Sequence, residues 1–182
     1  ELLSMNGYES VVVNVPATHP PRPFDGTLVP GYMAPENPDC HPEGTWAELD
    51  AELDGYRLYA DASHGETSKQ QRIETYRKLT RMRGEAFRYL LEDREPDFGF
   101  VQFQQTDTVY HEYPDDTEAV HAAYGAVDAE IGRILDTCDP DITMVVSDHG
   151  LGPMDREFRL NEFLRDQGAV KTTAGNGGMP PW

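Results

Sequence analysis

Apolar positions along the chain alternate between short continuous runs and long segments with helical spacing. Residues 11–15, 98–103 and 142–146 are short runs rich in β-branched and aromatic side chains, typical of strands buried on both faces of a parallel sheet. Residues 66–92 and the segment from Pro114 to about Thr137 carry apolar side chains three and four positions apart, which predicts two long helices. This order predicts an α/β fold, with a mostly parallel sheet and helices on both faces.

Shorter elements fill the rest of the chain. The first residues resemble the end of a helix, and Thr45 is placed to cap a short helix that runs to Leu53. Residues 56–60 alternate like a strand, and residues 160–167 predict a last helix, which ends at a glycine.

The segment 16–44 is a proline-rich loop or lobe. Such proline spacing excludes a regular helix and interrupts any hydrogen-bonded ladder, so we expect no strand there. Apolar side chains lie between the prolines and favour an ordered segment that packs. The prolines are Pro16, Pro20, Pro21, Pro23, Pro30, Pro35, Pro38 and Pro42.

Length and charge limit the classes of function. With 182 residues, the chain is expected to be part of a single domain (1–182), whose N- and C-terminal parts lie outside this sequence. The net charge of −18 disfavours nucleic-acid binding, because most of the surface repels phosphates. Such acidity suits a halophilic archaeon, where salt screens self-repulsion; an ordinary acidic cytosolic protein is the alternative.

The cysteines and the hydropathy of the chain indicate in which cellular compartment the protein is expected. Cys40 and Cys138 lie far apart and form no C-x-x-C motif, so neither a disulfide framework nor a zinc knuckle is indicated. The sequence contains no apolar run of the roughly 18 residues that a membrane span needs. We expect a cytoplasmic protein, and a signal peptide upstream of this sequence stays open.

Two pairs of candidate metal ligands follow predicted strands. Asp107 and His111 come just after the strand at 98–103, and their four-residue spacing brings both to one face if the segment is helical. Asp148 and His149 follow the run at 142–146, before a glycine that permits a tight turn. Ligand sites of open α/β sheets form at these strand ends, and carboxylate with imidazole suits zinc, manganese or iron.

Four stretches together resemble one known family. Residues 145–152, continued by 158–168, resemble the V-x-S-D-H-G segment and the following L-N-x-x-L-x-x-x-G of type I phosphodiesterase/nucleotide pyrophosphatase proteins. Residues 14–21 resemble that family's N-V-P-x-T-x-P-P loop, and residues 103–111 resemble its strand leading to D-x-x-x-H. The resemblance implies an alkaline phosphatase-like fold and a hydrolase of phosphodiester or nucleotide pyrophosphate bonds.

The resemblance also implies roles for individual residues. Asp107 and His111 would ligate one divalent ion, commonly zinc with manganese as an alternative, and Asp148 and His149 would ligate a second. The substrate would be a small phosphate ester or nucleotide, processed through a covalent phospho-enzyme.

Some family positions have no match in this chain. The family's threonine or serine nucleophile, a further aspartate and a further histidine are not found here, so we expect them outside this sequence and expect this chain alone to be inactive. Thr18 and His19 are candidates for substrate contact, with loop packing as the alternative. The other functions considered are a phosphomonoesterase, a sulfatase, a phosphoglycerate mutase relative and a non-catalytic binding protein of the same fold.

Overall fold

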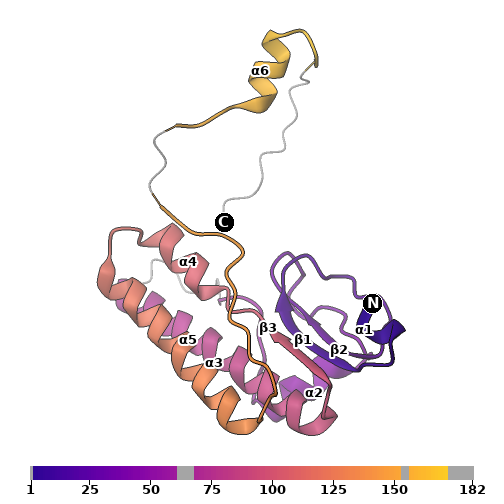
Figure 1. Cartoon of the computed structure of the whole chain (residues 1–182). Coiled ribbons are helices and arrows are strands. Elements are labelled where there is room, and N and C mark those ends of the chain that lie inside the picture. Colours follow the sequence, from indigo (N-terminus) through magenta and orange to yellow (C-terminus); the bar gives the residue numbers. More distant parts are fainter. Residues whose placement is uncertain (1, 61–67, 153–155, 172–182) are drawn as a thin grey trace. The chain divides into compact units, whose positions relative to one another are not determined.

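The computed structural model describes residues 2–60, 68–152 and 156–171. These divide into two compact units, Glu1–Val146 and Ser147–Trp182, and each is described by itself. The first unit holds the sheet and the long helices, and the described residues of the second hold one short helix (Figure 1).

A parallel sheet forms the centre of the first unit. Its strands are β1 (Ser10–Val15), β2 (Gly26–Pro30) and β3 (Phe98–Val101), arranged in the order β2-β1-β3. Both neighbours run parallel to β1, with Val11 opposite Thr27 on one side and Gly99 on the other. The predicted α/β class with parallel strands is therefore confirmed, and helices flank the sheet (Figure 1).

Two long helices, α3 (Lys69–Arg94) and α5 (Thr117–Thr137), lie side by side, and α3 packs against the sheet (Figure 1). The longer, α3, begins with a capping box in which Ser68 and Gln71 bond each other's backbone N–H groups. The predicted start at Glu66 lies outside the described residues. The helices of this unit are α1 (Leu2–Met5), α2 (Thr45–Glu52), α3, α4 (Gln105–Glu112) and α5 (Thr117–Thr137).

The start of α5 differs from the prediction by three residues. Pro114 was expected to open the helix, but the first helical residue is Thr117. The carboxylate of Asp116 accepts a hydrogen bond from the backbone N–H of Ala119 at 3.0 Å and so caps the helix.

The core lies between the sheet and α3. Val11 and Val13 of β1 and Val29 of β2 are fully buried in one cluster with Phe87 and Leu90 of α3. Gly99 permits the close approach of helix and edge strand, because an added Cβ would lie 2.7 Å from the ring of Phe87.

The proline-rich segment contains a strand, so the expectation of none there was wrong. Residues 24–29 lack proline, and β2 occupies this stretch and ends at Pro30. Leu28 also exchanges two backbone hydrogen bonds with His41, at 2.6 and 3.0 Å. A proline at the last position of an edge strand removes no essential donor, which is why the ladder survives.

The predicted strand at 56–60 is absent. The carboxylate of Glu36 accepts from the N–H groups of Leu58 and Tyr59 at 2.9 and 3.2 Å. The guanidinium of Arg83 donates to the carbonyls of Arg57 and Leu58 at 2.5 and 2.6 Å. Side chains therefore satisfy the backbone groups that a strand would present to a neighbour.

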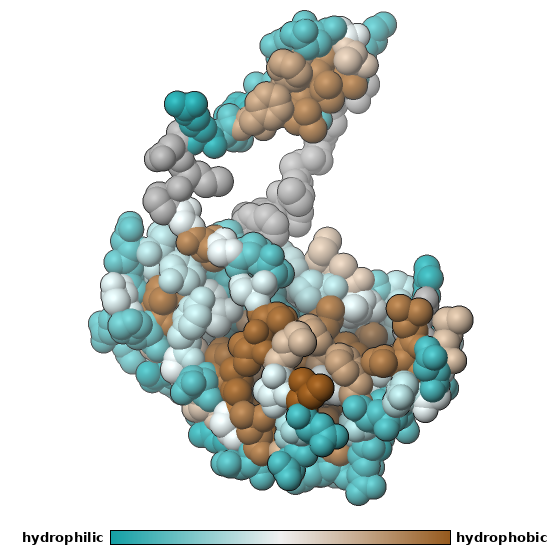
Figure 2. Space-filling model, viewed as in Figure 1, coloured by the Kyte–Doolittle hydropathy of each residue, from teal (hydrophilic) through white to brown (hydrophobic). Residues whose placement is uncertain are grey.

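The predicted buried strand at 142–146 is also absent. Ile142 is 81% exposed and Val146 65% exposed, and neither belongs to the sheet that the described residues form. β3 is a strand as predicted, but Phe98 and Phe100 are 41% and 37% exposed, so it is an edge strand rather than a buried one. Figure 2 shows such apolar side chains (brown) gathered on the face of the first unit that it presents.

The second unit contains the last predicted helix. α6 (Leu160–Asp166) lies where the apolar spacing placed it. Gly168 follows with a φ of 68°, a left-handed conformation that glycine adopts at helix ends without strain.

Candidate metal centre

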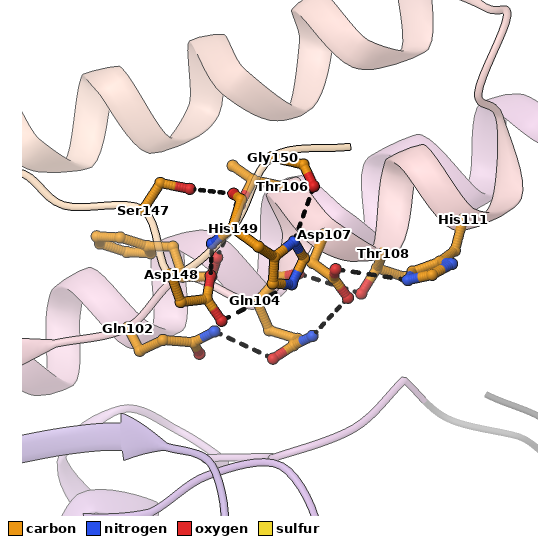
Figure 3. A network of polar contacts seen from close by, with 11 residues as sticks. Gln102, Gln104, Thr106, Asp107, Thr108, His111, Ser147, Asp148, His149 and Gly150 are labelled. Carbon is orange, nitrogen blue, oxygen red and sulfur yellow. Dashed lines mark hydrogen bonds and ion pairs between the residues drawn. The ribbon is translucent and has the colours of Figure 1, made fainter. Parts of the chain in front are cut away.

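The first pair of candidate ligands lies on one face of α4. This helix begins at Gln105, directly after the carboxyl end of β3, and it brings Asp107 and His111 together one turn apart. The distance from Asp107 Oδ1 to His111 Nε2 is 3.5 Å (Figure 3), and both side chains are partly exposed. The helical turn that the spacing required is therefore present.

The second pair lies at the start of the second unit. His149 Nε2 is 3.7 Å from Asp148 Oδ2, and His149 Nδ1 is 3.1 Å from the carbonyl oxygen of Gly150 (Figure 3). A carbonyl oxygen can only accept, so Nδ1 is the donor and carries the hydrogen. The lone pair of the neutral ring is then on Nε2, the atom that faces the aspartate.

Both distances fit two ligands of one ion. Zinc binds imidazole nitrogen and carboxylate oxygen at 2.0–2.1 Å with tetrahedral angles, which places two such ligands about 3.3 Å apart. The observed separations are 3.5 Å within the first pair and 3.7 Å within the second. Neither pair is a complete site, since the described residues contain no group of three or more His, Cys, Asp or Glu side chains arranged around one point.

Amide side chains lead from the sheet to Asp107. Gln104 Nε2 donates to Asp107 Oδ2 at 3.0 Å, and Gln102 Nε2 donates to Gln104 Oε1 at 3.1 Å (Figure 3). Asn14, on the neighbouring strand β1, donates to Gln102. Reasoning from sequence missed these residues, although polar positions at a strand end were a signal.

Thr18 and His19 lie in the loop after β1. Because β1 and β3 are parallel, this loop leaves the same edge of the sheet as the segment that leads to Asp107. The hydroxyl of Thr18 donates to the carbonyl of Val15 at 2.7 Å, and His19 Nε2 is 3.8 Å from Asp39 Oδ2. These contacts support the loop itself, and no observation assigns either residue to a substrate.

Cys40 offers no thiolate ligand in this structure. Both Cys40 and Cys138 are free thiols. Burial raises the pKa of the Cys40 thiol to about 12, so it remains protonated at neutral pH.

A separate cavity of about 370 Å³ lies between α3 and α5. Arg77, Arg81 and His121 line it, together with the small side chains of α5 and the buried Glu130. None of the four candidate ligands borders this cavity.

The whole described chain lacks a helix that is both long and apolar enough to cross a membrane. Comparison with known proteins gives one match: the model of the type I phosphodiesterase / nucleotide pyrophosphatase family matches residues 2–180. Neither a curated protein nor a solved structure matches the chain. Because the match covers nearly every residue, including both candidate ligand pairs, the chain belongs to the type I phosphodiesterase / nucleotide pyrophosphatase family.

Proposed function

We propose that this protein is a metal-dependent hydrolase of phosphodiester or nucleotide pyrophosphate bonds. Its family is one of phosphodiesterase- and pyrophosphatase-type hydrolases that act on small phosphate esters and are generally metal-dependent. The observation that carries the proposal is the 3.5 Å separation of Asp107 Oδ1 and His111 Nε2, directly after the carboxyl end of β3. Ligand sites of open α/β sheets form at such strand ends.

The four candidate ligands divide between two ions. Asp107 and His111 hold one divalent ion, and Asp148 and His149 hold the other. One carboxylate oxygen and one imidazole nitrogen per ion suit zinc, with manganese as the alternative. Calcium is disfavoured, because it prefers oxygen ligands alone.

The reaction proceeds through a covalent phospho-enzyme. A serine or threonine hydroxyl attacks phosphorus, and the leaving group, an alcohol from a diester or a phosphate from a pyrophosphate, departs with the proton of that hydroxyl. Water then cleaves the new oxygen–phosphorus bond, which releases the phosphomonoester and restores the hydroxyl. When bound, divalent ions lower the pKa of such a hydroxyl and neutralise the charge on the phosphoryl oxygens.

The protein works in the cytoplasm in this proposal. Free thiols at Cys40 and Cys138 are compatible with a reducing compartment. The net charge of −18 supports a cytoplasm with a high salt concentration and disfavours nucleic acid as a partner.

Hydrolysis of three aryl substrates by the full-length protein tests the proposal. A phosphodiester, a phosphomonoester and a sulfate are compared in high salt with zinc or manganese, with and without a chelator. We expect the diester to be cleaved fastest, and the chelator to abolish the reaction.

Two variants separate the ligand assignment from a general loss of charge. Asp107→Asn should lose activity and metal, whereas Asp115→Asn, which removes an exposed carboxylate from the turn after α4, should retain both. Absence of diesterase activity together with absence of bound metal would show that the family fold here serves another purpose.

A further inference from the structure

The amide network behind Asp107 begins at a buried residue of the central strand. Asn14 is 3% exposed and lies on β1. Its Nδ2 donates to the backbone carbonyl of Gln102 and to the side-chain Oε1 of Gln102, each at 2.9 Å. One amide therefore fixes both the backbone and the side chain of a residue 88 positions away.

The direction of every later hydrogen bond follows from this first one. Because Gln102 Oε1 accepts from Asn14, the Nε2 group of Gln102 points onward and donates to Gln104 Oε1. Gln104 Oε1 is thereby an acceptor, and its Nε2 donates to Asp107 Oδ2 (Figure 3). All the donors point toward the carboxylate. Turning any of these side-chain amides around would place two acceptors or two donors opposite each other.

We infer that Asn14, Gln102 and Gln104 form an amide relay that positions Asp107 as a metal ligand. This inference rests on the proposed function. The relay holds Oδ2 of Asp107, while Oδ1 lies toward His111 Nε2 at 3.5 Å. A carboxylate held at one oxygen presents the other at a fixed angle, so ligand and ion meet with less loss of side-chain freedom.

The backbone at Asn14 explains the residue type. Its φ is 65°, in the left-handed region, and the pairing of β1 with β2 shifts register between Val13 and Val15. Asparagine tolerates this conformation better than most residues, and such irregularities re-aim side chains at strand ends. The first residue of the N-V-P motif thus has a role that the sequence pattern did not suggest.

Zinc affinity, measured by competition with a chromogenic chelator, tests the relay in the full-length protein. Gln104→Met removes the last donor at nearly constant length and should weaken zinc binding about 10-fold, as loss of an outer-shell partner does. Asn14→Gly keeps the left-handed backbone but removes the first donor, and it should weaken binding by about 3-fold or more.

The double variant distinguishes a relay from separate structural effects. Asn14→Gly combined with Gln104→Met should bind zinc no more weakly than Gln104→Met alone, because the last link is already broken. Independent damage at two positions would multiply the losses. Should Gln104→Met fail to fold, Gln102→Met breaks the relay at its middle link and replaces it in the cycle.

Two control variants test whether the same types of substitution, made away from the relay, alter zinc affinity. Asn37→Gly changes an exposed asparagine whose φ is also positive, at 56°, and Gln70→Met changes an exposed glutamine of α3. Both should retain full zinc affinity.

The zinc affinity of Asp107→Ala distinguishes a failure of the proposed ligand set from a failure of the amide relay. If this variant binds zinc normally, the proposed ligand set is wrong. If it loses zinc while Gln104→Met and Asn14→Gly bind normally, the ligand set stands and the relay is overturned.

Discussion

Arg83 offers the sharpest test of what holds the first unit together. Its side chain is 1% exposed, and its guanidinium donates to the carbonyl oxygens of Arg57 and Leu58 at 2.5 and 2.6 Å. The guanidinium carbon also lies 5.0 Å from the centre of the Tyr56 ring. Arg83→Met keeps an unbranched apolar side chain in this place and removes all of these interactions.

The expected loss follows from these contacts. The carbonyl of the buried Leu58 would remain without a donor, which costs about 1–3 kcal/mol. The carbonyl of the exposed Arg57 can turn to water and costs less, and the lost cation–π contact adds about 1 kcal/mol. Removing a buried charge offsets part of this sum. We expect the free energy of unfolding to fall by about 2–4 kcal/mol.

Urea unfolding measures this loss. With a slope of about 2 kcal/mol per M, the midpoint should fall by about 1–2 M. Arg83→Lys should give an intermediate value, because an ammonium group cannot span both carbonyls as the guanidinium fork does. Arg81→Met, two residues before Arg83 on the same helix and exposed, should change stability by less than about 0.5 kcal/mol. Equal midpoints for Arg83→Met and Arg81→Met would refute the reasoning.

Four further predictions concern the ligands, the sheet and the charges. Asp148→Ala and His149→Ala in the full-length protein should each lower metal content and abolish turnover, whereas His121→Ala should do neither; metal analysis and activity assays decide. Gly26→Ala should lower the free energy of unfolding by at least about 1 kcal/mol in thermal or urea unfolding, because φ is 143° and the added Cβ would lie 2.0 Å from the Ser10 carbonyl oxygen. The hydrogen bond from Lys69 lowers the pKa of Asp116 below its usual 3.8, so this pair should stabilise the fold above about pH 4 and cease to do so as the pH falls through the lowered pKa. The stability difference between wild type and Asp116→Asn should therefore shrink in acid. Chelation should abolish binding of inorganic phosphate as well as turnover, as measured by calorimetry.

Local sequence patterns sufficed for the elements whose hydrogen bonds are local. The spacing of apolar residues placed α3, α5 and α6, since helices satisfy their own backbone groups. The start of α5 was missed because a capping aspartate, Asp116, competes with the nearby proline for the first turn. Such boundaries depend on one side chain rather than on a repeated pattern.

Elements that depend on distant partners were not predictable in this way. Residues 56–60 alternate like a strand, but their hydrogen bonds go to Glu36 and Arg83, which lie more than 20 positions away. The run 142–146 has a strand's composition, yet composition does not supply the neighbour that a strand needs.

The same distinction applies to the candidate site. Both candidate ligand pairs could be picked out from the sequence, because their members are four residues apart or adjacent. The role of Asn14 could not be predicted from the sequence, because its contact with Gln102 joins positions 88 apart. Strand pairing, which brings Val13 of β1 opposite Val101 of β3, creates that contact.

The acidic surface bears on the proposed requirement for metal. The protein carries −18 overall, and each ligand pair combines one carboxylate with one imidazole that must be neutral to bind an ion. A pair with its carboxylate ionised and its imidazole in this neutral form carries a charge of about −1, which repels a phosphate ester. A divalent ion held by such a pair would reverse its charge to about +1 and would attract the same ester over the short range that salt leaves unscreened. Metal dependence should accordingly appear already in phosphate binding, and a protein that bound phosphate equally well without metal would use a different site.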